Sequence, residues 1–228
     1  CLFLLSPTVV VSETGKYKDL VEIKGLYYKK DNSNDVPFTG TVTGQSKGKI
    51  KKGKKDGPWV DYHRNGKVSQ KGTFKDGKRE GPWVTYYIDG KLWRKGTYKD
   101  GKKDGPWVTY YDNGQLRSKE TYKDGKEEGP WVSYYDNGKL RGKGTYKDGK
   151  LDGPRVYYYE NGQLKSKGNY KDDNKHGPWV RYHSNGQLWD KGTYKDYYWD
   201  GPWVSFESDG TVNKKWTGTF KNGKKISD

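Results

Sequence analysis

Alanine and methionine are absent from this chain of 228 residues, and cysteine occurs once, as Cys1. Long helices form most readily from alanine, leucine, methionine and similar residues, so the composition excludes an all-helical protein. Hydrophobic residues make up only 29% of the chain, and aromatic residues alone account for 16%. A core built mainly from aliphatic side chains is therefore excluded, and any core must be aromatic.

Long hydrophobic runs are also missing, apart from the segment 1–12, Cys-Leu-Phe-Leu-Leu-Ser-Pro-Thr-Val-Val-Val-Ser. About a dozen residues are too few to cross a bilayer as a helix, but they are typical of the apolar part of a signal peptide. We interpret this segment as the remnant of a signal peptide. The alternative makes Cys1 the lipid-bearing first residue of a lipoprotein, and both interpretations predict export. A single cysteine excludes a disulfide framework and a Cys-based zinc site.

Glycine, aromatic residues and basic residues are abundant instead. The chain has 32 Gly, 10 Trp, 21 Tyr and 5 Phe, and its 45 Lys and Arg against 29 Asp and Glu give a net charge of +16. Low hydrophobicity with high net charge is typical of disorder, but disordered chains are poor in aromatic residues. A composition this skewed indicates a repeated structural unit.

A Gly-Pro dipeptide marks such a unit every 24 residues. It begins at Gly57, Gly81, Gly105, Gly129, Gly153, Gly177 and Gly201. Tryptophan follows the dipeptide in six of the seven units, at Trp59, Trp83, Trp107, Trp131, Trp179 and Trp203, whereas the fifth unit has Arg155. Seven tandem units of one length predict a repeat array in which each unit packs on its neighbours.

Two turn signals divide most units into two strands. Asn-Gly or Asp-Gly recurs in the first half of the unit, as at Asn113-Gly114, and Asp-Gly recurs in the second half, as at Asp100-Gly101. We expect the first of these dipeptides to form type I′ turns, because it tolerates positive φ at both central positions. The flanking runs are rich in Trp, Tyr, Val and Thr, which favour strands. The sequence predicts an all-β fold, an elongated single-layer antiparallel sheet of tandem hairpins.

Pairing across the first turn assigns the two faces of the sheet. With no bulge, Trp107 lies opposite Glu120, a glycine in most units, and Tyr111 lies opposite Leu116. We predict a packed face, whose core residues are Trp59, Trp83, Trp107, Trp131, Trp179, Trp203, Leu92, Leu116, Leu140, Leu164 and Leu188. The other face, here called the Lys/Tyr face, is predicted to carry Val108, Tyr110, Arg117, Lys119, Thr121 and Lys123 and their equivalents.

The chain organisation follows from these units. Residues 1–12 form the signal-peptide remnant or lipoprotein N-terminus, and residues 13–56 are predicted to form an N-terminal cap with a degenerate repeat. Residues 57–224 hold the seven 24-residue repeats, and residues 225–228 are a tail. Two extra residues around Trp216 alter the last unit.

The unit Gly-Pro-Trp-Val-x-Tyr-Tyr-x-Asn-Gly-x-Leu-x-x-Lys-Gly-Thr-Tyr-Lys-Asp-Gly-Lys-x-x-Gly resembles the MORN repeat in its bacterial variant form, over about residues 37–224. The resemblance implies a non-enzymatic scaffold that contacts proteins or anionic lipid surfaces. It also implies a bacterial protein of the periplasm, outer membrane, cell surface or medium, in a group of which some members are labelled antitoxin components. Arg155, Asp173 and Tyr197 depart from the pattern.

Histidine chemistry finds little support in the sequence. His63 and His183 occupy the second tyrosine position of their units and are interpreted as structural replacements, and His176 precedes a Gly-Pro. No second ligand recurs at a fixed spacing from any of them, so no catalytic residue, metal site or cofactor is predicted.

Basic charge allows two interpretations. A lysine-rich run next to the first unit holds Lys47, Lys49, Lys51, Lys52, Lys54 and Lys55. Lysines on a solvated face keep a sheet soluble, whereas the same charges can bind an anionic membrane or envelope surface. Arginine supplies only seven of the 45 basic residues, which argues against nucleic acid, because base recognition favours the arginine fork.

Variable positions on the constant scaffold are the remaining candidates for recognition. Trp93 and Trp189 occupy the position of Arg117, predicted on the Lys/Tyr face, and Trp199 follows Tyr197 and Tyr198. They either bind a partner or pack on neighbouring repeats. The sequence predicts an exported, non-enzymatic scaffold that binds a protein or an anionic envelope surface through the Lys/Tyr face. Alternatives are a repeat protein that binds cell-wall carbohydrate and an antitoxin- or immunity-like protein that binds a partner.

Overall fold

The computed structural model describes residues 13–30 and 36–228. The predicted signal-peptide remnant or lipoprotein N-terminus at 1–12 lies outside the described residues. The chain divides into two compact units, one reaching Lys91 and including Tyr98–Gly101, the other comprising Leu92–Thr97 and Lys102–Asp228. No helix in the described part of the chain has the length and apolar character needed to span a membrane.

In its described residues, the N-terminal unit contains eight strands and one short 3-10 helix. These are β1 (Glu13–Lys16), η1 (Tyr17–Asp19), β2 (Leu20–Ile23), β3 (Leu26–Lys29), β4 (Gly40–Thr43), β5 (Ser46–Lys51), β6 (Lys54–Tyr62), β7 (Val68–Lys75) and β8 (Lys78–Tyr86). β1 pairs with β4 in parallel, and β4 to β8 pair antiparallel in chain order. Leu20, Phe38, Val42 and Ile50 are buried in one cluster with Trp59, so the segment before the first unit covers its indole.

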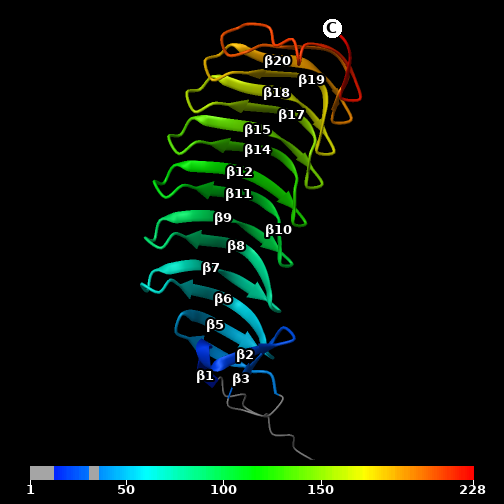
Figure 1. Cartoon of the computed structure of the whole chain (residues 1–228). Coiled ribbons are helices and arrows are strands. Elements are labelled where there is room, and N and C mark those ends of the chain that lie inside the picture. Colours follow the sequence, from blue (N-terminus) through cyan, green and yellow to red (C-terminus); the bar gives the residue numbers. More distant parts are fainter. Residues whose placement is uncertain (1–12, 31–35) are drawn as a thin grey trace, which may run out of the picture. The chain divides into compact units, whose positions relative to one another are not determined.

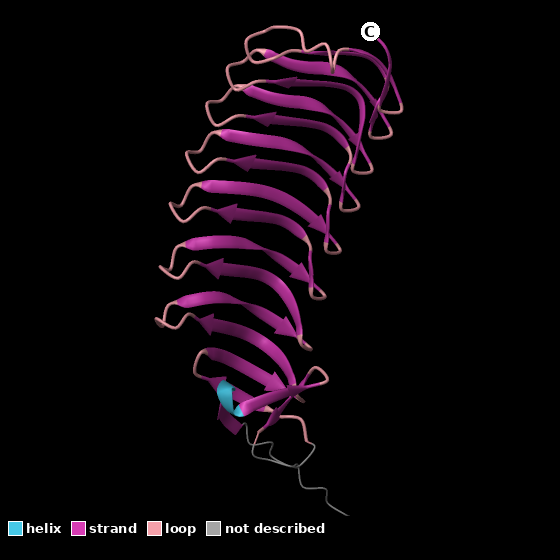
Figure 2. Ribbon diagram, viewed as in Figure 1, coloured by secondary structure: helices cyan, strands magenta, loops and turns pink. Residues whose placement is uncertain are grey.

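Strand β9 (Leu92–Lys99) carries residues of both units, and the remaining strands belong to the C-terminal unit. They are β10 (Lys102–Lys103), β11 (Gly105–Tyr110), β12 (Leu116–Lys123), β13 (Lys126–Glu127), β14 (Gly129–Tyr134), β15 (Leu140–Lys147), β16 (Lys150–Leu151), β17 (Gly153–Tyr158), β18 (Leu164–Lys171), β19 (Asn174–Tyr182), β20 (Leu188–Lys195), β21 (Tyr198–Trp199), β22 (Gly201–Ser205), β23 (Gly218–Lys221) and β24 (Lys224–Ser227). In this unit successive antiparallel hairpins lie side by side, with turns at both ends of the strands (Figures 1 and 2). The predicted all-β fold of tandem hairpins is confirmed.

The two turns of each repeat differ in conformation. Asp100 and Gly101 both have positive φ, 51° and 81°, as a type I′ turn requires. At Asn113-Gly114 only the glycine has positive φ, and Tyr111 N donates to Gln115 O across a longer turn. The predicted type I′ turn at Asn-Gly was therefore wrong. The asparagine acts through its side chain instead, because Asn113 Oδ1 accepts a hydrogen bond from Gln115 N and Nδ2 donates to Asp136 O of the next repeat.

A β-bulge follows from this longer turn. Trp107 pairs with Glu120 and Val108 with Lys119, as predicted, but the register then shifts and Tyr110 pairs with Leu116. The predicted pairing of Tyr111 with Leu116 was wrong, because the bulge inserts one extra residue into the second strand. Since directly paired side chains share a face, Leu116 lies with Tyr110 rather than with Trp107. The equivalent leucines 92, 116, 140, 164 and 188 are all half-buried.

The tryptophans form the core of the array on the face here called the Trp face. Trp59, Trp83, Trp107, Trp179 and Trp203 are at most 6% exposed, and Trp131 is half-buried. The buried indoles alternate edge-to-face with Phe74 or with tyrosines at centroid distances of 5.1–6.3 Å. Such pairs stabilise a core beyond the area they bury. The sheet therefore carries an aromatic core that is rebuilt in every repeat except the fifth, which has Arg155.

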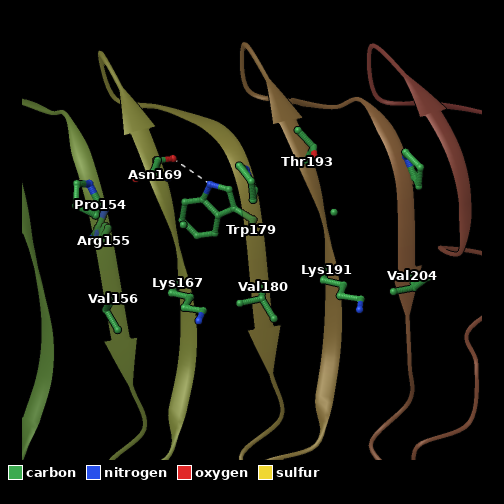
Figure 3. A pocket seen from close by; sticks show the side chains of 14 residues that line it. Pro154, Arg155, Val156, Lys167, Asn169, Trp179, Val180, Lys191, Thr193 and Val204 are labelled. Atoms are coloured by element: carbon green, nitrogen blue, oxygen red, sulfur yellow. Dashed lines mark hydrogen bonds between the residues drawn. The ribbon is translucent and has the colours of Figure 1, made fainter.

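Glycine in the preceding hairpin makes room for five of the six repeat indoles. A Cβ at Gly168 would lie 2.2 Å from the Trp179 ring, and Gly192 meets Trp203 in the same way. The Trp179 Nε1 donates to Asn169 O at 3.0 Å, shown by the dashed line in Figure 3. Five of the six repeat indoles thus pack on a glycine of the preceding hairpin. Those of Trp107, Trp179 and Trp203 also donate to its backbone, whereas those of Trp59 and Trp83 donate to the side chains of Asp61 and Gln70.

Candidate binding face

The face opposite the tryptophans presents a recurring set of side chains in successive repeats. Val180 pairs with Lys191, and Pro178 pairs with Thr193. Figure 3 shows Val156, Lys167, Val180, Lys191 and Val204 on successive strands, from β17 to β22. Because side chains alternate along a strand, these residues lie on the Lys/Tyr face, away from Trp179.

Two hollows on this face are lined by equivalent positions of the repeats, which share their Pro, Val and Lys residues. One, of about 650 Å³, is lined by Pro154, Arg155, Val156, Lys167, Gly168, Asn169, Pro178, Trp179, Val180, Lys191, Gly192, Thr193, Pro202 and Val204. The other, of about 550 Å³, runs from Pro106 to Val156 over the equivalent positions, with Lys119 and Lys143 beside it. We call them together the Pro/Val groove. Their volumes fall in the range of ligand pockets.

Proline and valine form the apolar floor of the groove, and lysine supplies its charge. The prolines are exposed and the valines half-buried, as expected where proline opens a strand and a β-branched residue continues it. Lys119, Lys143, Lys167 and Lys191 are exposed, and within residues 13–30 and 36–228 none of them forms a salt bridge. The groove therefore joins apolar surface to positive charge that its own chain leaves unneutralised.

The lysine-rich run before the first unit is split between the two faces. Lys47, opposite Val60, continues the groove pattern, and its Nζ lies 5.1 Å from the Tyr62 ring. Lys55 instead lies on the Trp face, with its Nζ 4.3 Å from the Trp59 ring. Lys49, Lys51, Lys52 and Lys54 are exposed on β5, on β6 and in the turn between them. The structure therefore does not gather the six lysines into one patch.

Cations also recur on the Trp face, two residues before four of the seven Gly-Pro dipeptides. Arg79, Lys103 and Lys175 lie over Trp83, Trp107 and Trp179 at 4.5–5.0 Å. Burial lowers the pKa of Lys103 and of Lys175. These cations pack on the core rings, a role that is distinct from the exposed lysines of the groove.

Four of the variable aromatic residues are exposed, and the fifth, Trp199, packs on the core. Trp93 and Trp189 are 41% and 38% exposed, and Tyr197 and Tyr198 are more exposed still. Trp199 stacks on Trp203 at 4.3 Å. Trp189 lies 4.2 Å from the Arg181 guanidinium, and Arg181 shares the Trp face with Trp179. The predicted place of Trp189 on the Lys/Tyr face was therefore wrong, because the bulge turns this position to the other side.

Two of the three histidines, His63 and His183, replace tyrosines, as predicted. Tyr111 Oη donates to Tyr134 O in the next repeat at 2.8 Å. His63 Nε2 lies 3.1 Å from Tyr86 O and His183 Nε2 lies 3.0 Å from Phe206 O, which are the equivalent carbonyls. Among the described residues, no group of three or more His, Asp or Glu side chains could hold a metal ion.

Sequence reasoning missed the groove itself and the pairing of Arg181 with Asp190 on the Trp face. The recurring Pro-x-Val, in register with Lys-x-Thr, was a signal for the groove, because alternation places all four side chains on one face. No pattern signalled the Arg181–Asp190 pair, which occurs in one repeat only.

Comparison with protein families decides the identity of the repeats. Six segments match the model described as MORN repeat variant, at residues 55–76, 79–100, 103–124, 127–148, 151–172 and 175–196, together more than half of the chain. The chain belongs to the MORN repeat family. No curated protein matches it.

MORN repeats are typically non-enzymatic scaffolds that commonly bind proteins or membrane lipids. Each matched MORN segment begins two residues before Gly-Pro and so includes the position of the packed cation.

Proposed function

We propose that this MORN protein is a non-enzymatic scaffold that binds an extended acidic segment of a partner protein in the Pro/Val groove. The observation that carries the proposal is the recurrence of one lining, with exposed and unneutralised lysines, over consecutive repeats. Charge complementarity then favours an acidic partner and speeds its association.

The shape of the groove favours a polypeptide over a flat lipid surface. Proline and valine form a recessed floor between lysines, and a flat anionic membrane would meet the lysines without filling that floor. Two strands at ~4.8 Å each give about 10 Å per repeat, and an extended chain advances ~3.3 Å per residue. About three residues of the bound segment would therefore cover one repeat, with an acidic residue at every third position next to a lysine.

Affinity would build up along the array. Each repeat contributes a modest contact, and linked contacts reach an avidity that one contact cannot. Lysine fills the groove position in successive repeats without arginine, so this position lacks the fork that recognises bases. Export of the chain stays a prediction that rests on residues 1–12.

Fluorescence anisotropy with a labelled peptide of about fifteen residues, carrying Glu at every third position, tests the proposal. We expect saturable binding that weakens as salt rises from about 50 to about 300 mM. Reversing two groove charges, with Lys143→Glu and Lys167→Glu together, should weaken binding about tenfold or more.

The matched control reverses Lys147 and Lys171, which lie in the same two repeats but outside the groove lining. An equal loss in both double variants would contradict the groove as the site. Flotation with phosphatidylserine vesicles adds a further arm. The polypeptide proposal fails if three results occur together: the parent chain binds vesicles, the groove variant does not, and the peptide binds neither chain. The partner is then a membrane.

A further inference from the structure

A cavity of about 310 Å³ lies on the Trp face near the C-terminal end of the described chain. Its lining consists of Arg181, Trp189, Asp190, Trp199, Ser205, Asn213 and Trp216. The cavity exists because the last repeat breaks the pattern. Strand β22 ends at Ser205 and β23 begins only at Gly218, and the intervening loop brings Trp216 over the end of the aromatic core.

Three indoles form the apolar part of the cavity. Trp199 is fixed by stacking on Trp203 and by an edge contact with Trp216 at 5.8 Å. Trp216 is 44% exposed and Trp189 38% exposed, so both keep ring surface open to a ligand. Rigid, partly exposed indoles bind at low cost in conformational entropy and offer flat apolar surface.

An ion pair forms the polar part. Arg181 Nε donates to Asp190 Oδ1 at 2.8 Å, and the second guanidinium nitrogen contacts Oδ2. Asp190 is only 2% exposed. A buried pair of this kind is weak evidence for stability, since its desolvation offsets its attraction. Arg181 still has further N–H donors, and each carboxylate oxygen of Asp190 has further acceptor capacity.

Ser205 and Asn213 complete the polar wall. Among residues 13–30 and 36–228, no hydrogen bond engages Ser205 Oγ, although the residue is 3% exposed. Asn213 N donates to Ser205 O at 2.8 Å, and Asn213 Oδ1 accepts from Trp216 N at 3.3 Å. Asn213 thus holds the loop that carries Trp216 against the cavity.

The charges select among ligand classes. Arg181 lies over Trp189, and Lys215 Nζ lies 4.9 Å from the Trp216 ring, so a cationic ligand would meet positive charge at both exposed indoles. Asp190 neutralises Arg181 inside the cavity, and the lining holds no other charged side chain to bind an anion. The lining suits a neutral molecule with an apolar face and several hydroxyl groups.

We infer that this cavity is a saccharide-binding site, in which a sugar ring packs on the Trp216 and Trp189 side chains and its hydroxyl groups bond to Arg181, Asp190 and Ser205. The site lies on the opposite face of the sheet from the Pro/Val groove and does not depend on the proposed function. It deepens the cell-wall alternative by naming one place on the chain where a glycan would bind.

Titration of the full chain with an N-acetylglucosamine trimer and a glucose trimer tests the inference, with tryptophan fluorescence and calorimetry as readouts. We expect saturable binding of at least one trimer, weakened about tenfold or more by Trp216→Ala. Trp216 lies outside the strands and is partly exposed, so this variant should keep the fold, and near-ultraviolet circular dichroism checks that it does.

Arg181→Lys keeps the charge but loses the planar fork, and it should also weaken binding. Trp93→Ala is the matched control, because Trp93 occupies the same repeat position as Trp189 but does not line the cavity. The inference is overturned if neither trimer binds at about 10 mM, a concentration well above that of most specific sugar sites. It is also overturned if Trp216→Ala binds like the parent chain, or if Trp93→Ala loses binding equally.

Discussion

Around Trp179 the indole lies on Gly168 of the preceding hairpin, and its Nε1 donates to a backbone carbonyl of that hairpin. Around Trp131 the preceding hairpin offers Glu120 where glycine is usual, and the indole has moved forward to Gly144. Trp179 is buried and Trp131 is half-buried, and the Trp131 Nε1 is buried without a hydrogen-bond partner among the described residues.

The space that Trp131 enters is free because the next repeat has Arg155 in place of tryptophan. The guanidinium of Arg155 lies 5.4 Å from the Trp131 ring and 4.4 Å from Tyr157. Glu120 is held in the glycine position by the hydroxyl of Tyr122, which donates to it at 2.9 Å. Glu120, which is larger than the usual glycine, is thus matched two repeats later by Arg155, which leaves free the space of the usual tryptophan. The sheet stays continuous through both repeats for this reason.

The largest expected effect comes from deleting the two indoles. Trp179→Ala should lower the free energy of unfolding by about 3–5 kcal/mol, because it leaves a cavity in a packed core. Trp131→Ala should cost less than half as much, since its indole is partly exposed and makes no Nε1 hydrogen bond. Urea unfolding of the full chain, followed by far-ultraviolet circular dichroism, measures both. Equal losses would remove the distinction between the two sites.

Adding a methyl group to the glycine under each indole tests the same difference between Trp179 and Trp131 by crowding the site. Gly168→Ala should destabilise by about 1–3 kcal/mol, because its Cβ would lie 2.2 Å from the Trp179 ring. Gly144→Ala meets Trp131 only at 2.9 Å and should cost less, since the displaced indole has room to give. Both glycines lie within strands, so they serve as matched variants, and a larger loss at Gly144 would contradict the packing described.

The smallest expected effect is the coupling between the two departures. Arg155→Trp alone should destabilise, because Trp131 already occupies the space over Gly144. With Glu120→Gly as well, Trp131 can return to the usual position, so the double variant should be more stable than the sum of the single changes by about 1 kcal/mol. Thermal unfolding of the four chains gives this coupling, and strict additivity would show that the two departures are independent.

Repeat length, strand content and the alternation of faces could all be predicted from the sequence, because each depends on local patterns such as Pro-Trp-Val and Asp-Gly. The bulge could not, because it depends on a turn in which Asn113 bonds through its side chain and leaves positive φ to the glycine alone. The extra residue that each bulge inserts moved Leu116 and Trp189 to the faces opposite those predicted. The cavity at Trp216 could not be predicted either, because it forms where the repeat pattern stops.

The hydrogen bond from the second tyrosine position to the next repeat has an evolutionary consequence. Its acceptor is a main-chain carbonyl, as at Tyr134 and Tyr158, so the bond does not depend on which side chain the neighbour carries. Histidine serves equally well as the partner, as at His63. A block of 24 residues can therefore be duplicated, inserted or lost in the gene without a matching mutation next to it, and the length of the array becomes a trait that selection can adjust one block at a time.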